Sequence, residues 1–172
     1  MTEIMKKALL HYLVGDATKP VKVPAMLPHV CNDINGWGRG YVLALRASYP
    51  QSEKSYHQWF FDGNPKLGDV QFVRCTDNVT VANMIGQRGT HWEGKTPPIR
   101  YEALRKALER VYASAEDEGV TVHMPRIGAD LAGGEWATIE GIIKDTMTVD
   151  TFVYTLESQR HKWPTEYETW PM

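Results

Sequence analysis

The residues best suited to chemistry stand in one stretch, residues 29–40, which holds a His, two Asn, an Asp, a Trp and three Gly at alternate positions. Alternating glycines let the backbone approach a ligand closely and turn its N–H groups toward it. A helical pattern follows directly, and the positive end of a helix favours an anion at the same place. The stretch therefore predicts an anion-binding loop, with a plain strand-to-helix turn as the alternative.

Strand-like and helix-like segments alternate along the chain and must position this stretch. Apolar and β-branched runs predict strands at residues 8–14, 25–31, 70–75, 79–85, 120–124 and 151–156. Apolar residues at helical spacing predict helices at residues 38–48, 53–61, 100–118 and 136–147. The clearest helix has an expected buried stripe of Leu104, Leu108, Val111, Tyr112 and Ala115. Strands separated by helices predict a largely parallel sheet with helices on both faces.

Four loops of unusual composition leave the carboxyl ends of the predicted strands, where parallel sheets bind their ligands. They start at Gly15, Asn32, Ile85 and Arg126. The last is a second glycine-rich loop directly before a helix. Two such loops facing one crevice predict a ligand that carries two phosphates.

Composition limits the class of protein. A chain of 172 residues suits one domain, and its net charge of −2 gives no field that would gather nucleic acid. We expect neither a membrane span nor a signal peptide, because no apolar run is long enough and the N-terminus lacks the signal pattern. Cys31 and Cys75 lack C-x-x-C spacing, so we expect reduced thiols in a cytoplasmic protein and no metal site.

Four motifs, in this order, resemble those of macrodomains, which are ADP-ribose-binding modules. They are Val-Gly-Asp (14–16), Cys-Asn-x-x-Asn-Gly-Trp-Gly-x-Gly (31–40), Pro-Arg-Ile-Gly-x-x-Leu-Ala-Gly-Gly (125–134) and Val-Tyr-Thr-Leu (153–156). The chain most resembles the ADP-ribose-1''-phosphate phosphatase branch, which shares His-x-Cys-Asn before the first glycine loop and Ala-Leu-Arg-x-x-Tyr-Pro after it. The resemblance implies a three-layer α/β/α macrodomain with a mixed, largely parallel sheet over residues 1–156, and leaves an aromatic tail at residues 157–172.

The resemblance also implies contacts with ADP-ribose. Asp16 would accept a hydrogen bond from the adenine amino group, with a turn cap as the alternative. Asn32 and Asn35 would bond the distal ribose, with Asx turns as the alternative. Trp37 would flank that ribose or cap the edge of the core. Tyr154 would lie near adenine or pack as a buried sheet tyrosine.

The other predicted ligand-binding residues lie in the same loops. They are Gly15, Ala17, Cys31, Gly36, Gly38, Gly40, Ile85, Gly86, Gln87, Pro125, Arg126, Ile127, Gly128, Leu131, Ala132, Gly133 and Gly134. Gly36, Gly38 and Gly40 would supply the backbone N–H donors of the first phosphate loop. The second phosphate loop would be formed by Gly128, Leu131, Ala132, Gly133 and Gly134. We expect no cofactor.

Three residues are candidates for catalysis. His29 matches a histidine proposed to act at the distal phosphate in phosphatase-like relatives, and a packed strand histidine is the alternative. Asp33 would orient a water, whereas Asp130 would act on a water or turn away from the pyrophosphate. A different macrodomain branch uses a Lys and an Asp where this chain has Gln87 and Ala132, so its mechanism is not expected here.

The predicted function is binding of ADP-ribose or ADP-ribose-1''-phosphate with hydrolysis at the distal ribose. The bond broken would hold a phosphate or a protein side chain, so ADP-ribosylated proteins are candidate partners. A monomer is expected, with no membrane partner. One alternative is a non-catalytic module that recognises ADP-ribose marks or sequesters the nucleotide. Another is a scaffold that binds partners through its aromatic tail.

Overall fold

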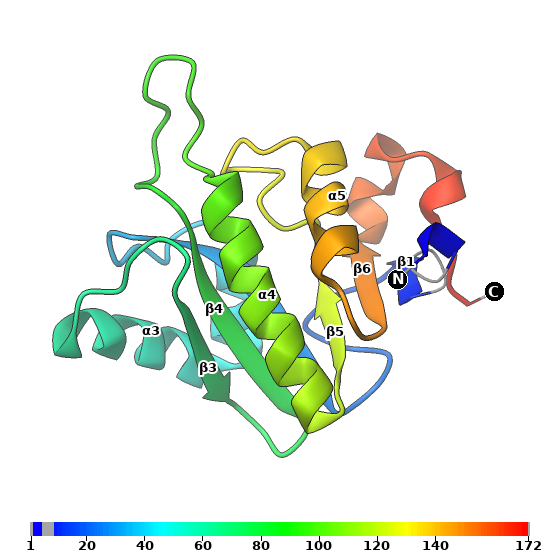
Figure 1. The fold of residues 1–172 in the computed structure, drawn as a ribbon, viewed down its shortest axis with the longest axis horizontal. Helices are drawn as coiled ribbons and strands as arrows, with labels where there is room; N and C mark the ends of the chain where they lie inside the picture. Colours follow the sequence, from blue (N-terminus) through cyan, green and yellow to red (C-terminus); the bar gives the residue numbers. More distant parts are fainter. Residues whose placement is uncertain (1, 5–8, 172) are drawn as a thin grey trace.

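The computed structural model describes residues 2–4 and 9–171, which form a six-stranded sheet covered by helices on both faces (Figure 1). The strands are β1 (Leu10–Val14), β2 (Ala25–Asn32), β3 (Val70–Arg74), β4 (Val79–Gln87), β5 (Thr121–Met124) and β6 (Thr151–Thr155). The helices are α2 (Tyr41–Ser48), α3 (Pro50–Asp62), α4 (Tyr101–Glu118), α5 (Trp136–Thr146) and the 3-10 turns η1 (Glu157–Lys162) and η2 (Thr165–Tyr167). The predicted α/β architecture is confirmed; Ala8 of the predicted first strand lies outside the described residues.

The sheet runs in the order β1-β6-β5-β2-β4-β3. The four pairs from β1 to β4 are parallel, and only the edge strand β3 pairs antiparallel with its neighbour β4. The predicted mixed, largely parallel sheet is confirmed. Because five neighbouring strands share one direction, the loops that follow them leave the same edge of the sheet.

Helices α4 and α5 cover one face of the sheet and lie in front of it in Figure 1. The predicted stripe of α4 is confirmed as fully or almost fully buried, and it packs on strand residues such as Met26 and Met84. Helices α2 and α3 cover the other face, where Leu45 and Tyr56 pack on Leu27. Complete burial of one such large apolar side chain contributes about 1.5–3 kcal/mol, so these stripes fix both helix layers.

Two helix starts differ from the sequence prediction. The helix predicted at residues 38–48 begins only at Tyr41, because the glycine-rich residues before it remain loop. The helix predicted at residues 53–61 begins earlier, at Pro50. Proline suits the first helical position, since its fixed φ is helical and no N–H is needed there. Both boundaries lie next to the candidate site and set where its first loop ends.

The chain after β6 runs back along the free edge of β1. The backbone N–H groups of Thr169 and Trp170 donate to the carbonyl oxygen of Tyr12 over 2.8 and 2.9 Å, and the Tyr12 N–H donates to Thr169 Oγ1 over 2.8 Å. These contacts protect an edge strand whose polar groups would otherwise be open to pairing. Within residues 2–4 and 9–171, no helix has both the length and the apolar character needed to cross a bilayer.

Candidate ligand-binding site

Three of the four loops singled out in the sequence, those after β2, β4 and β5, meet at the carboxyl edge of the sheet. The N–H of Gly89, just beyond β4, donates to Asp33 Oδ1 in the loop after β2 over 2.8 Å. The N–H of Ile99 donates over 3.1 Å to the carbonyl of Ala132 in the loop after β5. A Cβ placed on Gly40 would lie 3.4 Å from Leu131 Cδ1, so the two glycine-rich loops touch. The sequence elements therefore converge on one region.

The first loop is folded around the side chain of Asn32. Asn32 Oδ1 accepts hydrogen bonds from the N–H groups of Ile34 and Gly36 over 3.1 and 2.9 Å, and Nδ2 donates to the Gly36 carbonyl over 3.0 Å. Tyr56 from α3 donates its hydroxyl to the Asn32 carbonyl over 2.7 Å. Asn32 thus has the contacts of the Asx-turn alternative, and its amide shapes the loop.

Trp37 lies beneath this loop and leaves the neighbouring glycine open. Its side chain is buried, its Nε1–H donates to the Val42 carbonyl over 2.9 Å, and its ring packs between those of His29 and Tyr56. Gly38, by contrast, is exposed, and no atom lies within 4 Å of the place where a Cβ would stand. Trp37 supports the loop as a core residue, and Gly38 leaves its outer surface accessible.

The second loop is held in a shape that its glycines alone permit. Gly128 and Gly133 have φ angles of 72° and 76°, which disfavour residues with a side chain. The N–H of Gly134 donates to the Gly128 carbonyl over 2.8 Å, and a Cβ on Gly134 would lie 2.5 Å from that same oxygen. Helix α5 begins at Trp136, directly after the loop, so its positive end lies beside these backbone groups.

Asp16 follows β1 at the other end of the site. Its Oδ1 accepts hydrogen bonds from the N–H and the hydroxyl of Thr18 over 2.8 and 2.7 Å. Among the described residues, Thr18 supplies both of the hydrogen bonds that the Asp16 carboxylate accepts, and both use the same oxygen. Asp16 is half-buried, so Oδ2 can accept from a ligand while Oδ1 holds the turn.

Tyr41, the first residue of α2, carries a buried hydroxyl beside Asp16. Burial raises the pKa of this hydroxyl, and the negative charge of Asp16 raises it further. Among the described residues the hydroxyl has no hydrogen-bond partner. Buried polar groups are nearly always bonded, so this hydroxyl is a candidate contact for a molecule bound next to Asp16. The sequence reasoning had not singled out Tyr41, although it directly follows the glycines of the first loop.

Tyr154 has the contacts of a buried sheet tyrosine, which was the alternative to a position near adenine. It is 3% exposed, its hydroxyl accepts from the Val21 N–H over 2.9 Å, and the same oxygen bonds His123 Nδ1 over 2.8 Å. A Cβ on Gly15 would lie 3.4 Å from the Tyr154 ring, so the loop after β1 rests on that ring. Tyr154 thus supports the base of the site.

His29 is packed between the sheet and α2. It is 3% exposed, its Nε2 lies 2.5 Å from Asn83 Oδ1, and the rings of Trp37 and Tyr41 stand edge-on to it. Burial lowers the pKa of His29 to about 4, so the ring is neutral at pH 7. The neighbouring thiol of Cys31 is also buried, and its pKa is raised. This environment favours the packed alternative over direct proton transfer to a ligand.

The two aspartates proposed for catalysis differ in exposure. Asp33 is half-buried between the loops after β2 and β4, where the Gly89 N–H fixes one carboxylate oxygen. Asp130 is exposed at the tip of the second loop, and its carbonyl accepts from the Gly133 N–H over 3.0 Å. Gln87 donates to the Gly89 carbonyl over 2.9 Å. Of the two carboxylates, Asp33 has the more fixed position.

The predicted ligand-binding residues divide into supporting and accessible positions. Those buried beneath the loops are Ala17, Cys31, Asn32, Trp37, Ile85, Gly86, Ile127, Ala132 and Tyr154. Those half-buried or exposed are Gly15, Asp16, Asn35, Gly36, Gly38, Gly40, Gln87, Pro125, Arg126, Gly128, Leu131, Gly133 and Gly134. Their contacts with a ligand stay predictions. Asn35 places its Oδ1 2.5 Å from His57 Nδ1 of α3, which leaves its Nδ2 as the ribose-facing candidate.

The segment between β4 and α4 was not anticipated as part of the site. It projects beyond the edge of the sheet (Figure 1), and the backbone groups of Glu93 and Thr96 pair across it over 2.9 and 3.0 Å. A Cβ on Gly133 would lie 2.6 Å from Trp92 Cζ2 and 2.7 Å from Pro97 Cβ, so the segment packs on the second loop. It therefore forms one wall beside that loop.

Comparisons with known proteins agree with this arrangement. No family model matches the chain. A solved macrodomain protein from Streptomyces coelicolor is 45% identical, with a TM-score of 0.75, and the match covers 85% of this chain and 98% of that one. A chromodomain-helicase-DNA-binding protein 1-like of Danio rerio is 29% identical over 150 residues, which are 78% of this chain. An ADP-ribose 1''-phosphate phosphatase of Candida albicans is 24% identical and matches over 86% of this chain and 100% of its own length.

The extent of these matches differs. The chain spans only 14% of the length of the Danio rerio relative. The Streptomyces match, by contrast, extends over almost the whole solved domain, and the mixed sheet with helices on both faces is common to macrodomain structures. On this identity and coverage, the chain belongs to the macrodomain family.

Proposed function

We propose that this macrodomain binds ADP-ribose, or a derivative substituted at the distal ribose, along the carboxyl edge of its sheet. One observation carries the proposal: two glycine-rich loops touch each other, and each leads directly into the N-terminus of a helix, α2 or α5. Backbone N–H groups and two positive helix ends near one place suit a diphosphate. Asp16 Oδ2, which the Thr18 turn does not use, suits the amino group of the adenine base.

Titration calorimetry tests the proposal directly. We expect one ADP-ribose per chain with a Kd in the micromolar to submillimolar range, about −5 to −8 kcal/mol. AMP should bind more weakly, because it lacks the second phosphate and the distal ribose. Equal Kd values for the two ligands would remove the second loop from the site, and the absence of any heat with ADP-ribose would reject the proposal.

Replacing Asp16 with Asn tests base recognition. The Asn side chain keeps an oxygen for the Thr18 turn but puts an amide donor where the second carboxylate oxygen stood. We expect ADP-ribose affinity to fall by about 1.5–3 kcal/mol, the range for a hydrogen bond to a charged group. Affinity for ribose 5-phosphate, which has no base, should stay within twofold. Equal losses for both ligands would show that Asp16 only supports the loop.

Hydrolysis at the distal ribose is a second candidate function. The Candida phosphatase, named for ADP-ribose 1''-phosphate, matches this chain over its full length, which favours the phosphate ester as the bond to test. Asp33 is the candidate to orient the attacking water, since the Gly89 N–H holds it between two loops of the site. The assay incubates the protein with ADP-ribose-1''-phosphate and, separately, with ADP-ribosylated protein, and measures released phosphate and ADP-ribose.

Asp33→Asn separates an enzyme from a binding module. The substitution keeps an acceptor for Gly89 and removes the charge, so we expect turnover to fall about a hundredfold while ADP-ribose affinity stays within a few-fold. His29→Gln should leave turnover per folded molecule almost unchanged, because His29 is packed away from the loop surface. If the parent protein releases neither product, the non-catalytic binding module is the function that remains.

A further inference from the structure

The guanidinium of Arg126 is enclosed by an aromatic cage of Tyr12, Trp136, Trp163 and Tyr167. Its central carbon lies 3.8 Å from the ring centroid of Trp163 and 5.0 Å from those of Tyr12 and Tyr167. The ring of Trp136, at the start of α5, is 5.3 Å away. The face of each ring attracts the cation, and this attraction is stronger where water is excluded. The cage therefore holds Arg126 firmly.

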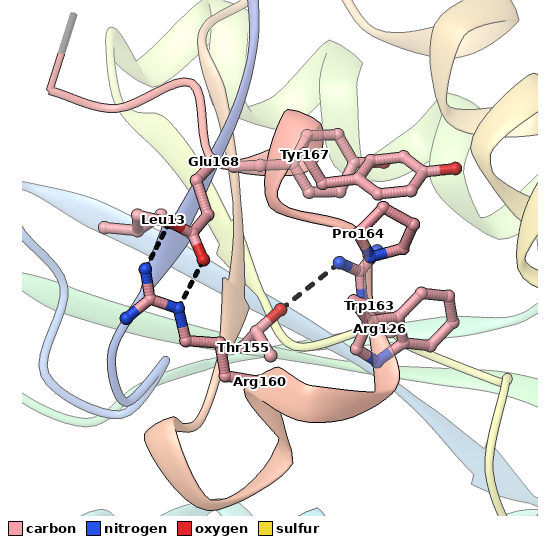
Figure 2. A pocket seen from close by; sticks show the side chains of 9 residues that line it. Leu13, Arg126, Thr155, Arg160, Trp163, Pro164, Tyr167 and Glu168 are labelled. Atoms are coloured by element: carbon pink, nitrogen blue, oxygen red, sulfur yellow. Dashed lines mark hydrogen bonds and ion pairs between the residues drawn. The ribbon is translucent and has the colours of Figure 1, made fainter.

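The Arg126 side chain is hydrogen-bonded to the end of β6. Arg126 Nη2 donates to Thr155 Oγ1 over 3.3 Å (Figure 2), and the Thr155 carbonyl accepts from the N–H of Gly15 over 2.9 Å. Within residues 2–4 and 9–171, Arg126 Nε and Nη1 are buried without a partner. Arg126 thus connects the loops after β5 and β1, and the aromatic rings are its main compensation for burial.

Two walls of the cage come from the segment after β6, residues 157–171, which we call the strap. The strap is closed on itself by Arg160, whose Nε and Nη2 donate to the two carboxylate oxygens of Glu168 over 2.6 and 2.7 Å (Figure 2). Its far end is hydrogen-bonded to the Tyr12 backbone at the edge of β1. Trp163 and Tyr167 lie inside the turn that Arg160 and Glu168 close, so their rings are held in place.

Arg126 is also the residue at which the second loop begins. Its carbonyl accepts from the Ala129 N–H over 3.3 Å, in the first turn of that loop. The loop's later part is fixed separately, by the bond between Gly134 and Gly128 and by the Ala132 carbonyl, which binds Ile99. The start of the loop therefore relies on Arg126, and Arg126 relies on rings from the strap.

We infer that the strap positions the second loop through Arg126, so that ADP-ribose affinity depends on aromatic side chains that do not touch the ligand. The inference rests on the proposed function for its ligand and assigns a role to the aromatic tail. The pocket between the strap and Arg126 has a volume of about 10 Å³, which suits a single water and leaves no room for a nucleotide there. The strap acts on the loop, not as a binding surface for the ligand.

Two variants test the inference, one of the enclosed arginine and one of a ring that encloses it. Arg126→Gln removes the enclosed cation, and Trp163→Ala removes the ring nearest to it while leaving Arg126 in place. We expect both to weaken ADP-ribose binding at least tenfold in calorimetry, at a temperature well below each variant's Tm. Arg126→Lys should recover only part of the lost ADP-ribose affinity. The ammonium of Lys lacks the planar face that lies over the Trp163 ring, and it lacks the second nitrogen that donates to Thr155.

Val73→Ala is a control for lost stability. Val73 is buried in β3, at the opposite edge of the sheet from the strap, and its truncation should lower Tm while leaving ADP-ribose affinity within twofold. Hydrogen exchange supplies a readout that needs no ligand. In both cage variants, amides at residues 127–134 should exchange at least tenfold faster, whereas those of α4 should keep the parent rate.

The outcomes are distinct. If the parent protein binds ADP-ribose and both cage variants bind it within twofold, with unchanged exchange at residues 127–134, the inference is wrong. Weakened binding in Arg126→Gln but not in Trp163→Ala would also overturn it, since Arg126 would then contact the ligand itself. If the parent protein does not bind ADP-ribose, the proposed function fails, and faster exchange in both variants would still establish the positioning role.

Discussion

Replacing Gly38 with Asp is expected to weaken ADP-ribose binding about a thousandfold without lowering the Tm. Gly38 is exposed, and no atom lies within 4 Å of its Cβ position, so the new side chain fits without strain. In the proposed complex it would stand beside the diphosphate. Two like charges 4 Å apart near a protein surface repel by about 4 kcal/mol, which corresponds to about a thousandfold in Kd.

A matched control adds the same charge elsewhere. Gly141 in α5 is also exposed with an open Cβ position, so Gly141→Asp should leave ADP-ribose affinity within twofold. Calorimetry in parallel with thermal unfolding separates binding from stability. If Gly38→Asp binds ADP-ribose like the parent protein, the first glycine loop does not contact the phosphates, and the proposed orientation of the ligand is wrong.

A second large effect concerns acid stability. Burial lowers the pKa of His29 to about 4 and that of His123 to about 3, with the charge of Lys22 adding to the shift at His123. In the unfolded chain each imidazole titrates near pH 6.5. Between these values the unfolded state binds more protons than the native state, so the free energy of unfolding falls as the pH is lowered.

The expected size follows from about 1.4 kcal/mol per pKa unit. His29 alone should contribute about 3 kcal/mol, fully present above pH 6.5 and lost as the pH falls toward 4. Urea unfolding at pH 7.5, 6.5, 5.5 and 4.5, values chosen to span the titration range, measures this loss. His29→Gln should flatten the curve relative to the parent protein, because Gln does not titrate. Parallel curves for the two proteins would contradict the assigned pKa shift.

The sequence predicted the fold well where local patterns decide the structure. The buried stripe of α4 is predicted by residue spacing alone. The alternation of strands and helices predicts parallel strands, and this places the glycines and the aspartate that come after those strands at one edge of the sheet. The start of α3 at Pro50 was missed, because a proline after a tyrosine marks a helix end as readily as a helix start. Local chemistry could not distinguish those two uses of proline.

Side-chain roles within the site were less predictable, because they depend on partners far along the chain. Asn32 is bonded by Tyr56, which is 24 positions away, and His29 by Asn83, which is 54 positions away. Tyr154 meets the backbone of Val21 across 133 positions. The type of each residue suited ligand binding, but only the fold shows which polar groups are already satisfied. Asp16 keeps an accessible oxygen because its turn uses the other one.

The route of the strap along β1 has a consequence for the order in which this protein can fold during its synthesis. Strand β1 is synthesised before its strand partner β6, and Thr169, whose N–H and hydroxyl bond the outer edge of β1, lies 157 positions after Tyr12. Until those residues emerge, Leu10 to Val14 present an unpaired apolar strand. Between the synthesis of β1 and that of β6 the nascent chain therefore carries an unpaired strand, which is open to pairing with another chain.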